Sequence, residues 1–286
     1  MIGGAYMKSK KMPQKSTVLL MLFLIFCSVI FIYPLFYLVF YSLKTNNEIF
    51  LTNPFGFPKD IQWVNYVNAI TAFDIVSFFR NSVIVSVVSI AGILLFALPF
   101  AYATTRMIWR GRQIATNYLT MGLFIPIQVI IIPLSILVRD MHLSNTYFAL
   151  IVPYVAFNLA FSSMILSTSF AGIPREMEES AVIDGAGIYR TFVSIVMPLV
   201  KPAIATTIIF AFLNVWNEYT VASILISKNS VKTLPIGLAN FVGQHSTDWG
   251  AMGACLVMAS IPTIVIYLIF SEQVERALTI GGAVKG

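Results

Sequence analysis

Charged residues are scarce in this chain, and their scarcity excludes an ordinary water-soluble domain. Asp, Glu, Lys and Arg make up 10% of its 286 residues, whereas hydrophobic residues make up 58%. Soluble domains carry about 25% charged residues. We therefore expect a lipid bilayer, rather than water, to surround most of the chain.

The chain also has few histidines and cysteines, which leaves little material for a metal site or a disulfide. His142 and His245 fall in or beside expected outer loops, and Cys27 and Cys255 lie far apart in apolar segments. No Cys-x-x-Cys, His-x-x-x-His or His-Glu-x-x-His spacing occurs, and no phosphate-binding loop with the order Gly-x-x-x-x-Gly-Lys-Ser/Thr. We expect no catalytic residue, no metal and no nucleotide cofactor on this chain.

Long uncharged segments are what the chain has instead. Six of them are long enough for a helix that crosses a bilayer, which needs about 20 residues. Without water only helices or a closed barrel can satisfy the backbone, and these segments are too long and too continuously apolar for barrel strands. The sequence predicts an all-α membrane protein with six transmembrane helices. The segments are residues 16–43, 81–105, 113–138, 141–174, 202–226 (interrupted by Glu218 alone) and 249–271.

Prolines occur inside five of these six segments. Each removes a backbone donor and tends to kink its helix, which neighbouring helices tolerate in a membrane. They either shape a static bundle or allow flexure in a protein that changes conformation. The prolines are Pro34, Pro99, Pro126, Pro133, Pro153 and Pro262.

The distribution of Lys and Arg indicates the orientation. With the N-terminus inside, twelve of the 18 Lys and Arg residues fall on the cytoplasmic side and six outside, which favours cytoplasmic N- and C-termini. This predicts cytoplasmic tails at 1–15 and 273–286 and a membrane domain at 16–272. Because the basic residues cluster at helix ends, the net charge of +6 predicts no nucleic-acid partner.

A polar stretch, residues 174–202, separates the fourth and fifth segments. Glu176, Glu178 and Glu179 suit the positive N-terminal end of a short helix. Gly185 can then adopt the positive φ of a turn. A second short helix is expected to pack its apolar side on the membrane domain, leaving the acidic and small residues outward. Its inward residues would be Ile188, Phe192, Ile195 and Val196. A pair of interfacial helices without a partner would fit the same composition.

Within this stretch, Glu179-Ser180-Ala181, Asp184-Gly185-Ala186 and Met197-Pro198 resemble the EAA loop of ABC importer permeases. That pattern reads Glu-Ala-Ala, Asp-Gly-Ala and Leu-Pro, and it agrees with this chain in residue type and spacing over some 24 positions. Ser180 and Met197 depart from it while conserving size or apolarity.

The rest of the chain is similar to the MalG-like branch of the binding-protein-dependent transport family, the carbohydrate-importing permeases. The stretches that carry this likeness include Lys44-Thr45-Asn46-Asn47-Glu48-Ile49-Phe50, Trp216-Asn217-Glu218-Tyr219 and the ending Ala283-Val284-Lys285-Gly286. The resemblance covers essentially the whole chain.

The resemblance implies the permease subunit of an ATP-driven importer that moves a di- or oligosaccharide across the cell membrane. It would form a heterodimer with a homologous second permease, and an extracytoplasmic sugar-binding protein would dock outside. Two ATP-binding subunits, which hold ATP and Mg, would dock from the cytoplasm, so this chain would catalyse no reaction. Residues 174–202 would form a coupling helix seated in a cleft of the ATPase. The implied coupling residues are Glu178, Glu179, Ser180, Ala181, Asp184, Gly185 and Ala186.

The fifth segment holds a second polar cluster, formed by Asn214, Asn217 and Glu218. On a continuous helix Asn214 and Glu218 would share a face. The cluster either joins neighbouring helices or lines the sugar pathway. A self-sufficient secondary transporter would instead be expected to show internal repeats and charges at the membrane midplane, and no convincing repeat is visible.

Overall fold

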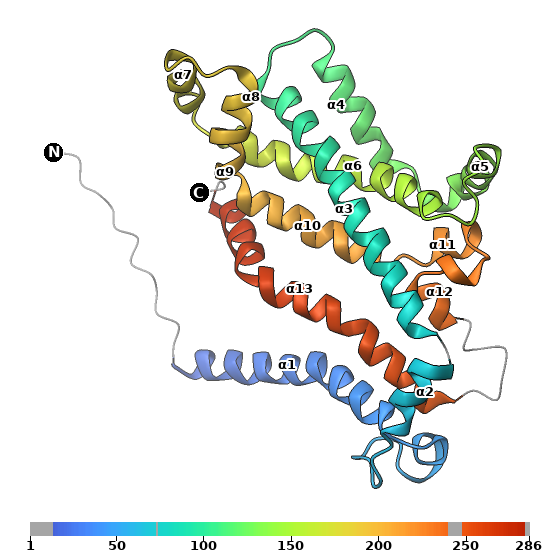
Figure 1. Ribbon diagram of the computed structural model, residues 1–286. Coiled ribbons are helices and arrows are strands. Elements are labelled where there is room, and N and C mark those ends of the chain that lie inside the picture. Colours follow the sequence, from blue (N-terminus) through green and yellow to red (C-terminus); the bar gives the residue numbers. More distant parts are fainter. Residues whose placement is uncertain (1–13, 73, 240–247, 284–286) are drawn as a thin grey trace. The chain divides into compact units, whose positions relative to one another are not determined.

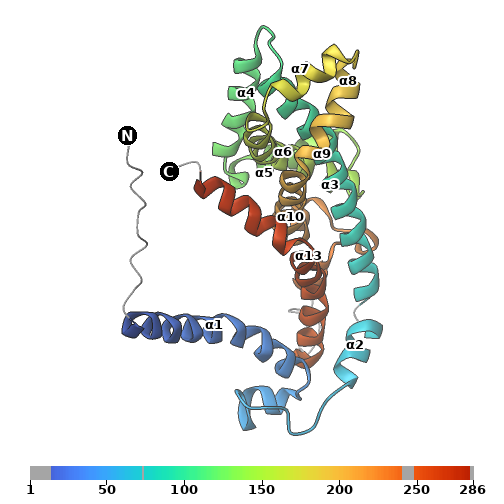
Figure 2. The same ribbon diagram turned by 90° about the vertical axis from the view of Figure 1, so that its left-hand side faces the viewer.

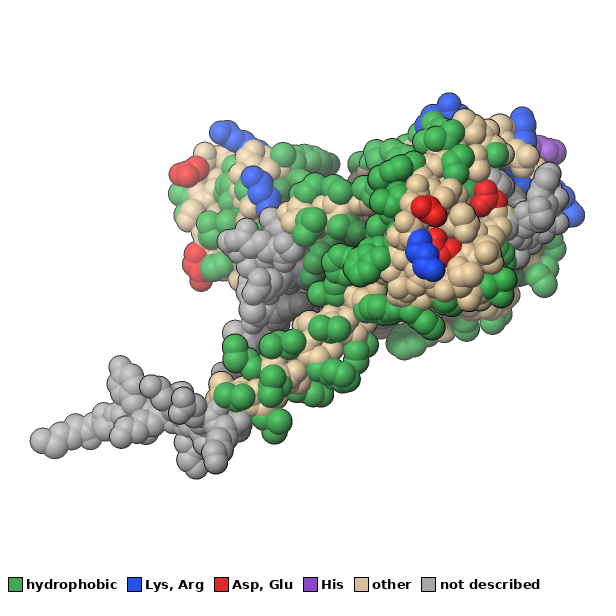
Figure 3. Space-filling view, turned by 90° about the horizontal axis from the view of Figure 1, so that it is seen from below, with side chains coloured by type: hydrophobic (Ala, Val, Ile, Leu, Met, Phe, Trp, Pro, Cys, Tyr) green, Lys and Arg blue, Asp and Glu red, His purple; other side chains and the backbone are tan. Residues whose placement is uncertain are grey.

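The computed structural model of the chain describes residues 14–72, 74–239 and 248–283, and within these ranges its regular structure is entirely helical (Figure 1). The all-α prediction is thereby confirmed. Two compact units emerge: one comprises the chain up to Val67 together with Asp248–Val257, and the other comprises Asn68–Thr247 and the chain from Met258. In the view of Figure 3, hydrophobic side chains cover most of the described helix surface and charged side chains are few.

The first unit contains the long helix α1, Gln14–Ser42. In its segment Thr17–Ser42 the most apolar 18-residue window has a mean hydropathy of 2.8, and none of that window is buried within the chain. A helix that is apolar on all sides is stable only in an apolar solvent, so this exposure fits a membrane span. The π-helix η1, Glu48–Thr52, and the start of α13, Trp249–Ala283, complete the unit with the first residues of α2, Val64–Ala72.

In the second unit, α3 (Ile75–Arg106) packs along α6 (Phe148–Ala171), and α10 (Lys201–Trp216) lies against both. Small side chains make this close packing possible, as is usual between membrane helices. A Cβ added at Gly92 on α3 would lie 2.8 Å from Val155 Cγ2 on α6. The buried small residues are Ser82, Ser86, Ser89, Ala97 and Ala101 on α3, Ala149, Ala160, Ser162 and Ser163 on α6, and Ala203, Ala205 and Ala211 on α10.

The third predicted span is not one straight helix. It consists of α4 (Arg112–Met121) with the 3-10 turn η2 (Gly122–Phe124), followed by α5 (Ile127–Asp140), and the two parts meet at 104°. Proline disfavours a helical conformation in the preceding residue, and Ile125, directly before Pro126, is extended. The segment 113–138, predicted as one transmembrane helix, is therefore divided just before Pro126, one of the prolines expected to kink its helix.

The fifth predicted span is also broken. α8 (Ile188–Thr191), the π-turn η3 (Phe192–Val196) and α9 (Met197–Leu199) precede α10 at an angle of 76°, and α10 ends at Trp216 instead of continuing to 226. Four helices in the described part of the chain are long and apolar enough to cross a membrane alone, and the number reaches six if each bent pair is one span.

Short helices and turns lie at the two ends of the second unit. The polar loop with α7 (Glu176–Ile183) and α8 lies where α3 ends (Figures 1 and 2). α11 (Thr220–Leu225), η4 (Asn229–Val231) and α12 (Leu234–Ala239) lie toward the start of α3. There the Ser82 Oγ accepts a hydrogen bond of 2.8 Å from the Leu234 amide, and the Asn81 side chain donates to two loop carbonyls, at 2.9 and 3.0 Å.

The predicted cytoplasmic tails, 1–15 and 273–286, stay predictions. Most of the N-terminal tail, 1–15, lies outside the described residues. The expected boundary at residue 272 does not coincide with a helix end, because α13 continues to Ala283.

Candidate functional site

The loop 174–202 begins with α7, which starts on an acidic first turn and ends at Ile183, two residues before Gly185. Gly185 has φ 79°, as the sequence predicted. The amide of Ala186 donates to the carbonyl of Ala181 at 2.9 Å, and the amide of Gly185 donates to that of Val182 at 3.0 Å. This pair of bonds is the Schellman arrangement that satisfies the last carbonyls of a helix. The turn therefore holds α7 at a defined angle to the segment that follows.

An ion pair attaches α7 to the end of α3. Arg106 Nε donates to Glu178 Oε1 at 2.9 Å, and the two side chains are only 6% and 19% exposed. Arg106 Nη1 also donates to the carbonyl of Ile173 at 2.9 Å and contacts that of Phe170 at 3.4 Å. A cation is favourable there because carbonyls at a helix C-terminus carry partial negative charge. One guanidinium thus joins α3, the end of α6 and α7.

This arrangement corrects the expectation that all the acidic and small residues of α7 face outward. Glu178 and Ala181 point toward the membrane domain, and Ala181 is buried. Most of the other predicted coupling residues face outward, as the sequence analysis expected. Glu179, Ser180, Asp184 and Gly185 are exposed, and Ala186 is half-buried.

Apolar side chains that the sequence analysis missed project from the same turn. Ile183 is 85% exposed, Tyr189 is 84% exposed, and Val182 beside them is also exposed. Exposing such apolar side chains to water is unfavourable in free energy. Apolar patches on a protein surface often mark interaction sites. The sequence offered a signal, because Ile183 and Tyr189 flank the predicted Asp-Gly turn on both sides.

The second half of the loop packs partly as predicted. Val196 is fully buried, and the ring of Phe192 lies 4.8 Å from that of Tyr102 on α3. Ile195 is half-buried. Ile188 does not face the membrane domain, since 48% of it is exposed. It lies at the start of α8, before the chain reaches the core.

The polar cluster after α10 differs from its prediction. Because α10 ends at Trp216, Glu218 lies in the connection to α11 and does not share a helical face with Asn214. Its carboxylate accepts hydrogen bonds from the Tyr154 hydroxyl at 2.6 Å and from the amides of Val221 and Ala222 at 2.7 and 3.1 Å. Glu218 therefore satisfies the first amides of α11 and ties that helix to α6.

The two asparagines of the cluster have different partners. Asn217, the residue directly after α10, donates its side-chain N–H to the carbonyl of Leu213 at 2.8 Å. Asn214 donates to the side chain of Asn158 on α6 at 3.1 Å. Asn158 in turn donates to the Tyr154 carbonyl at 2.8 Å. The sequence analysis missed Asn158 because a single amide in an apolar span shows no pattern.

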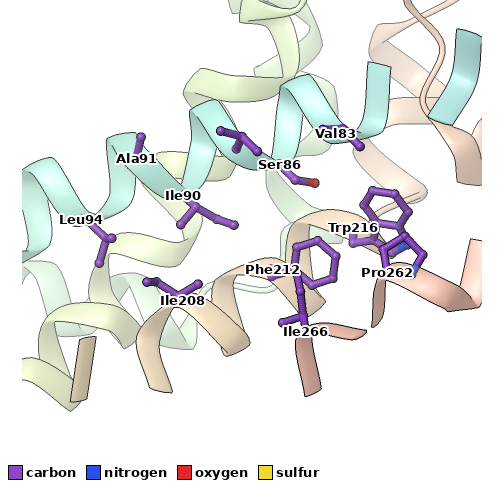
Figure 4. A pocket seen from close by; sticks show the side chains of 11 residues that line it. Val83, Ser86, Ile90, Ala91, Leu94, Ile208, Phe212, Trp216, Pro262 and Ile266 are labelled. Carbon is purple, nitrogen blue, oxygen red and sulfur yellow. The ribbon is translucent and has the colours of Figure 1, made fainter. Parts of the chain in front are cut away.

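An apolar groove of about 490 Å³ lies on another face of α10, between α3 and the later part of α13 (Figure 4). Ser86 supplies the one hydroxyl among its described lining residues, and the Trp216 Nε1 is already bonded to the carbonyl of Ala259 at 3.1 Å. The groove therefore suits an apolar occupant and not a hydrophilic solute. It is lined by Val83, Ser86, Val87, Ile90, Ala91, Leu94, Ile208, Phe212, Trp216, Pro262 and Ile266.

Proteins of known family resemble the chain over nearly its whole length. The family model described as "Binding-protein-dependent transport system inner membrane component" matches residues 93–280. The diacetylchitobiose uptake system permease protein NgcG of Streptomyces coelicolor is 33% identical over 260 residues, which cover 90% of this chain and 86% of that protein. The sulfoquinovosyl glycerol transport system permease protein SmoH of Agrobacterium fabrum is 31% identical, with 88% of each chain covered.

Solved structures share the fold. A chain of a bacterial ABC transporter involved in the import of the acidic polysaccharide alginate superposes with a TM-score of 0.81 at 22% identity, covering 94% of this chain and 99% of that chain. A chain of the bacterial alginate ABC transporter in complex with an alginate pentasaccharide-bound periplasmic protein gives a TM-score of 0.65 at 15% identity, with 91% and 96% covered.

Proposed function

We propose that the chain is one permease subunit of an ATP-driven importer for a di- or oligosaccharide. The premise is that it belongs to the family of binding-protein-dependent transport system inner membrane components. Members of this family are permease subunits of ABC transporters and not enzymes. The protein is a multi-pass protein of the cell membrane. Relatives such as NgcG support a carbohydrate as the cargo.

The exposed apolar turn of the loop 174–202 carries the proposal that ATP-binding subunits dock there. Ile183 and Tyr189 are more than four-fifths exposed, and the exposed carboxylates of Glu179 and Asp184 lie in the same short segment. An apolar centre with a charged rim is the usual anatomy of a protein–protein interface. We infer that this turn is the coupling helix, that it enters a cleft of the ATPase, and that Glu179 contacts a basic residue there.

We call the exposed turn with Ile183 and Tyr189 the docking turn. The ion pair between Arg106 and Glu178 supports a route by which movement of the docking turn reaches the membrane helices. Closure of two ATP-binding subunits around ATP and Mg would displace the turn. The buried guanidinium would pass that displacement to α3 and to the end of α6, which it joins. Rigid-body switching between two states of the transmembrane bundle would follow, driven by the difference in binding energy between the states.

The remaining partners follow from the family. A homologous second permease would complete the pathway as a heterodimer. A sugar-binding protein would deliver the cargo on the outer side, and the alginate transporter with its periplasmic protein supports this arrangement. Both termini would lie in the cytoplasm. Asn214 and Asn217 would face the pathway. Glu218 would hold α11 and α6 together near the outer end of that pathway.

Co-purification tests the docking turn. The tagged wild-type chain, solubilised from its own membrane, is expected to bring an ATP-binding subunit with it. Ile183→Asp and Tyr189→Asp each place a charge where an apolar contact forms, and recovery should fall about tenfold or more. Leu51→Asp is the matched control, because Leu51 is also apolar and exposed but lies in a loop expected outside. No ATP-binding subunit with the wild type, or wild-type recovery with both loop variants, would overturn the proposal.

A further inference from the structure

Three side-chain contacts form a ladder along the seam between α6 and α10. The outermost joins Tyr154 to Glu218 at 2.6 Å, the next joins Asn158 to Asn214 at 3.1 Å, and the third sets the rings of Phe161 and Phe210 edge to face with centroids 5.5 Å apart. On α6 the residues recur every three or four positions, and on α10 Phe210 and Asn214 are four apart, so each of these sets lies on one helical face. Glu218 follows the end of α10, in the connection to α11. The ladder therefore runs along the seam as one continuous strip.

The amide contact lies near the midpoint of α6. Asn158 is ten residues from the start of this 24-residue helix, and ten residues span about 15 Å. The hydrocarbon core is about 30 Å thick. If α6 crosses the bilayer over its whole length, Asn158 lies near the middle of the membrane.

The amides retain hydrogen-bonding capacity. Asn214 is exposed on the surface of the chain, and Asn158 is half-buried. Each amide has two N–H donors and a carbonyl oxygen, and Asn214 uses one N–H in the bond to Asn158. Facing such groups to lipid is costly, because lipid tails offer no hydrogen bonds. Something polar must therefore lie against them.

α10 separates this strip from the apolar groove. Phe210 and Asn214 are two residues away from Ile208, Phe212 and Trp216, which line the groove. Two residues correspond to about 200° around a helix with 3.6 residues per turn. One face of α10 therefore suits lipid or an apolar segment, and the nearly opposite face presents amides and aromatic rings.

We propose that the Asn158–Asn214 pair, with the Phe161–Phe210 rings beside it, is a contact site for sugar at the middle of the membrane. Neutral amides can donate to and accept from hydroxyl groups, and they offer no charge to hold an ion. The adjacent rings present an apolar surface to the C–H faces of a sugar ring. This inference rests on the proposed transport function and adds to it a site, with Asn158 as a residue of the pathway.

The reaction rate of an introduced cysteine tests whether a water-soluble reagent reaches the pair. The test uses the whole importer, purified with its second permease, ATP-binding and sugar-binding subunits and placed in liposomes, with Cys27 and Cys255 replaced by Ser. Asn158→Cys and Asn214→Cys are each treated with a membrane-impermeant methanethiosulfonate. Both should react about tenfold or more faster than the control Leu95→Cys, which is exposed on the apolar helix α3. Reaction as slow as that of the control would overturn the site.

Transport kinetics supply the second readout. Labelled maltose, cellobiose and diacetylchitobiose serve as probes, and the probe that the wild-type importer accumulates fastest is used. Asn158→Ala or Asn214→Ala should raise its KM about fivefold, the effect of one lost hydrogen bond. Asn117→Ala, an exposed amide on α4, is the control and should leave KM unchanged. A wild-type KM in both seam variants would reduce the pair to a helix–helix contact. Failure of the wild type to move any probe would contradict the proposed function instead.

Discussion

At the scale of single residues, the structure assigns different tasks to side chains that look alike in the sequence. Glu178 and Glu179 are neighbours in an acidic run, yet Glu178 is partly buried against Arg106 and Glu179 is exposed. Which carboxylate turns inward depends on a guanidinium 72 residues earlier in the chain. No local pattern contains that information. The positive φ of Gly185, in contrast, depends on its immediate neighbours and could be predicted.

The buried ion pair gives the first prediction. Glu178→Gln leaves the Arg106 charge without its counter-ion in a site that is almost closed to water. Removing one partner of a buried pair costs about 3–5 kcal/mol, and the incomplete burial of Glu178 places the expected loss at the low end, about 3 kcal/mol. Thermal unfolding of the purified complex measures it. Glu176→Gln, an exposed carboxylate in the same helix, is the control.

The double variant Arg106→Met with Glu178→Gln separates the charge from the contact. Because it removes the unpaired charge, it should recover part of the lost stability. If the pair also transmits movement, its sugar uptake per ATP hydrolysed should stay below that of the wild type. A double variant no more stable than Glu178→Gln would contradict the assignment of the loss to an uncompensated charge.

Two glycines of the same loop give a matched pair of variants. Gly185 has φ 79°, and Gly187 has φ −70°. A Cβ added at either position meets no atom within 4 Å. Gly185→Ala should therefore cost about 1 kcal/mol through the left-handed conformation alone, whereas Gly187→Ala should be neutral or slightly stabilising. Protease sensitivity of the loop in the purified complex reports the difference, and equal sensitivity of both variants would contradict it.

At the scale of elements, the sequence predicted the existence of the long helices better than their ends. Four apolar segments became helices that can cross a membrane alone. The other two are bent, at 104° and 76°, because a charge-free window shows length and polarity but not direction. Beyond the end of α10 at Trp216, the Glu218 carboxylate accepts a hydrogen bond from Tyr154 on another helix. A local sequence pattern does not contain such a contact.

The loop after α1, which contains the π-helix η1, is held by buried charged side chains. Lys44 is fully buried and donates its Nζ to the carbonyls of Asn53 and Pro54 at 2.7 and 3.2 Å. Glu48 is buried beside it and accepts hydrogen bonds from the Lys59 amide at 2.7 Å and from the Asn53 side chain at 3.0 Å. Buried charges must be compensated by such bonds. Together they close the segment 44–59 on itself.

The carboxylate of Glu48 makes this loop sensitive to acid. Burial alone would raise its pKa, but the hydrogen bonds from Lys59 and Asn53 and the charges of Lys44 and Lys59 outweigh burial and hold the pKa below its ordinary value of 4.5. A depressed pKa contributes stability that is fully present above the ordinary value and is lost as the pH falls through the folded value. Hydrogen exchange of residues 48–60 should therefore accelerate as the pH falls below the ordinary value of 4.5, after correction for intrinsic rates.

The variant Glu48→Gln provides the control for the acid effect. It keeps the shape but removes the titrating group, so the corrected exchange of the loop should be faster at neutral pH and nearly independent of pH between 3 and 6. If the loop of this variant still opens in acid as the wild-type loop does, another group is responsible.

At the scale of the whole molecule, the charges of the second unit support one orientation. Arg106 lies at the end of α3 and is bonded to α7, while the start of α3 is bonded to the segment 228–239. Six basic residues belong to the segments near the α7 end and four to the segments at the other end. The first group is Arg106, Arg110, Arg112, Arg175, Arg190 and Lys201, and the second is Arg80, Arg139, Lys228 and Lys232. Positive loops tend to remain in the cytoplasm, so the docking turn should face the cytoplasm.

Labelling from one side of the membrane tests this orientation. With Cys27 and Cys255 replaced by Ser, Ile183→Cys and Leu51→Cys introduce single thiols at two exposed positions, one in the docking turn and one in the loop after α1. In spheroplasts an impermeant maleimide should label Leu51→Cys alone. In inside-out vesicles from which the ATP-binding subunits have been removed, it should label Ile183→Cys alone. Labelling of Ile183→Cys in intact spheroplasts would place the turn outside, where no ATP-binding subunit could reach it. Because coupling to ATP requires the turn and the ATPase on one side, this result would remove the physical basis of the transport mechanism.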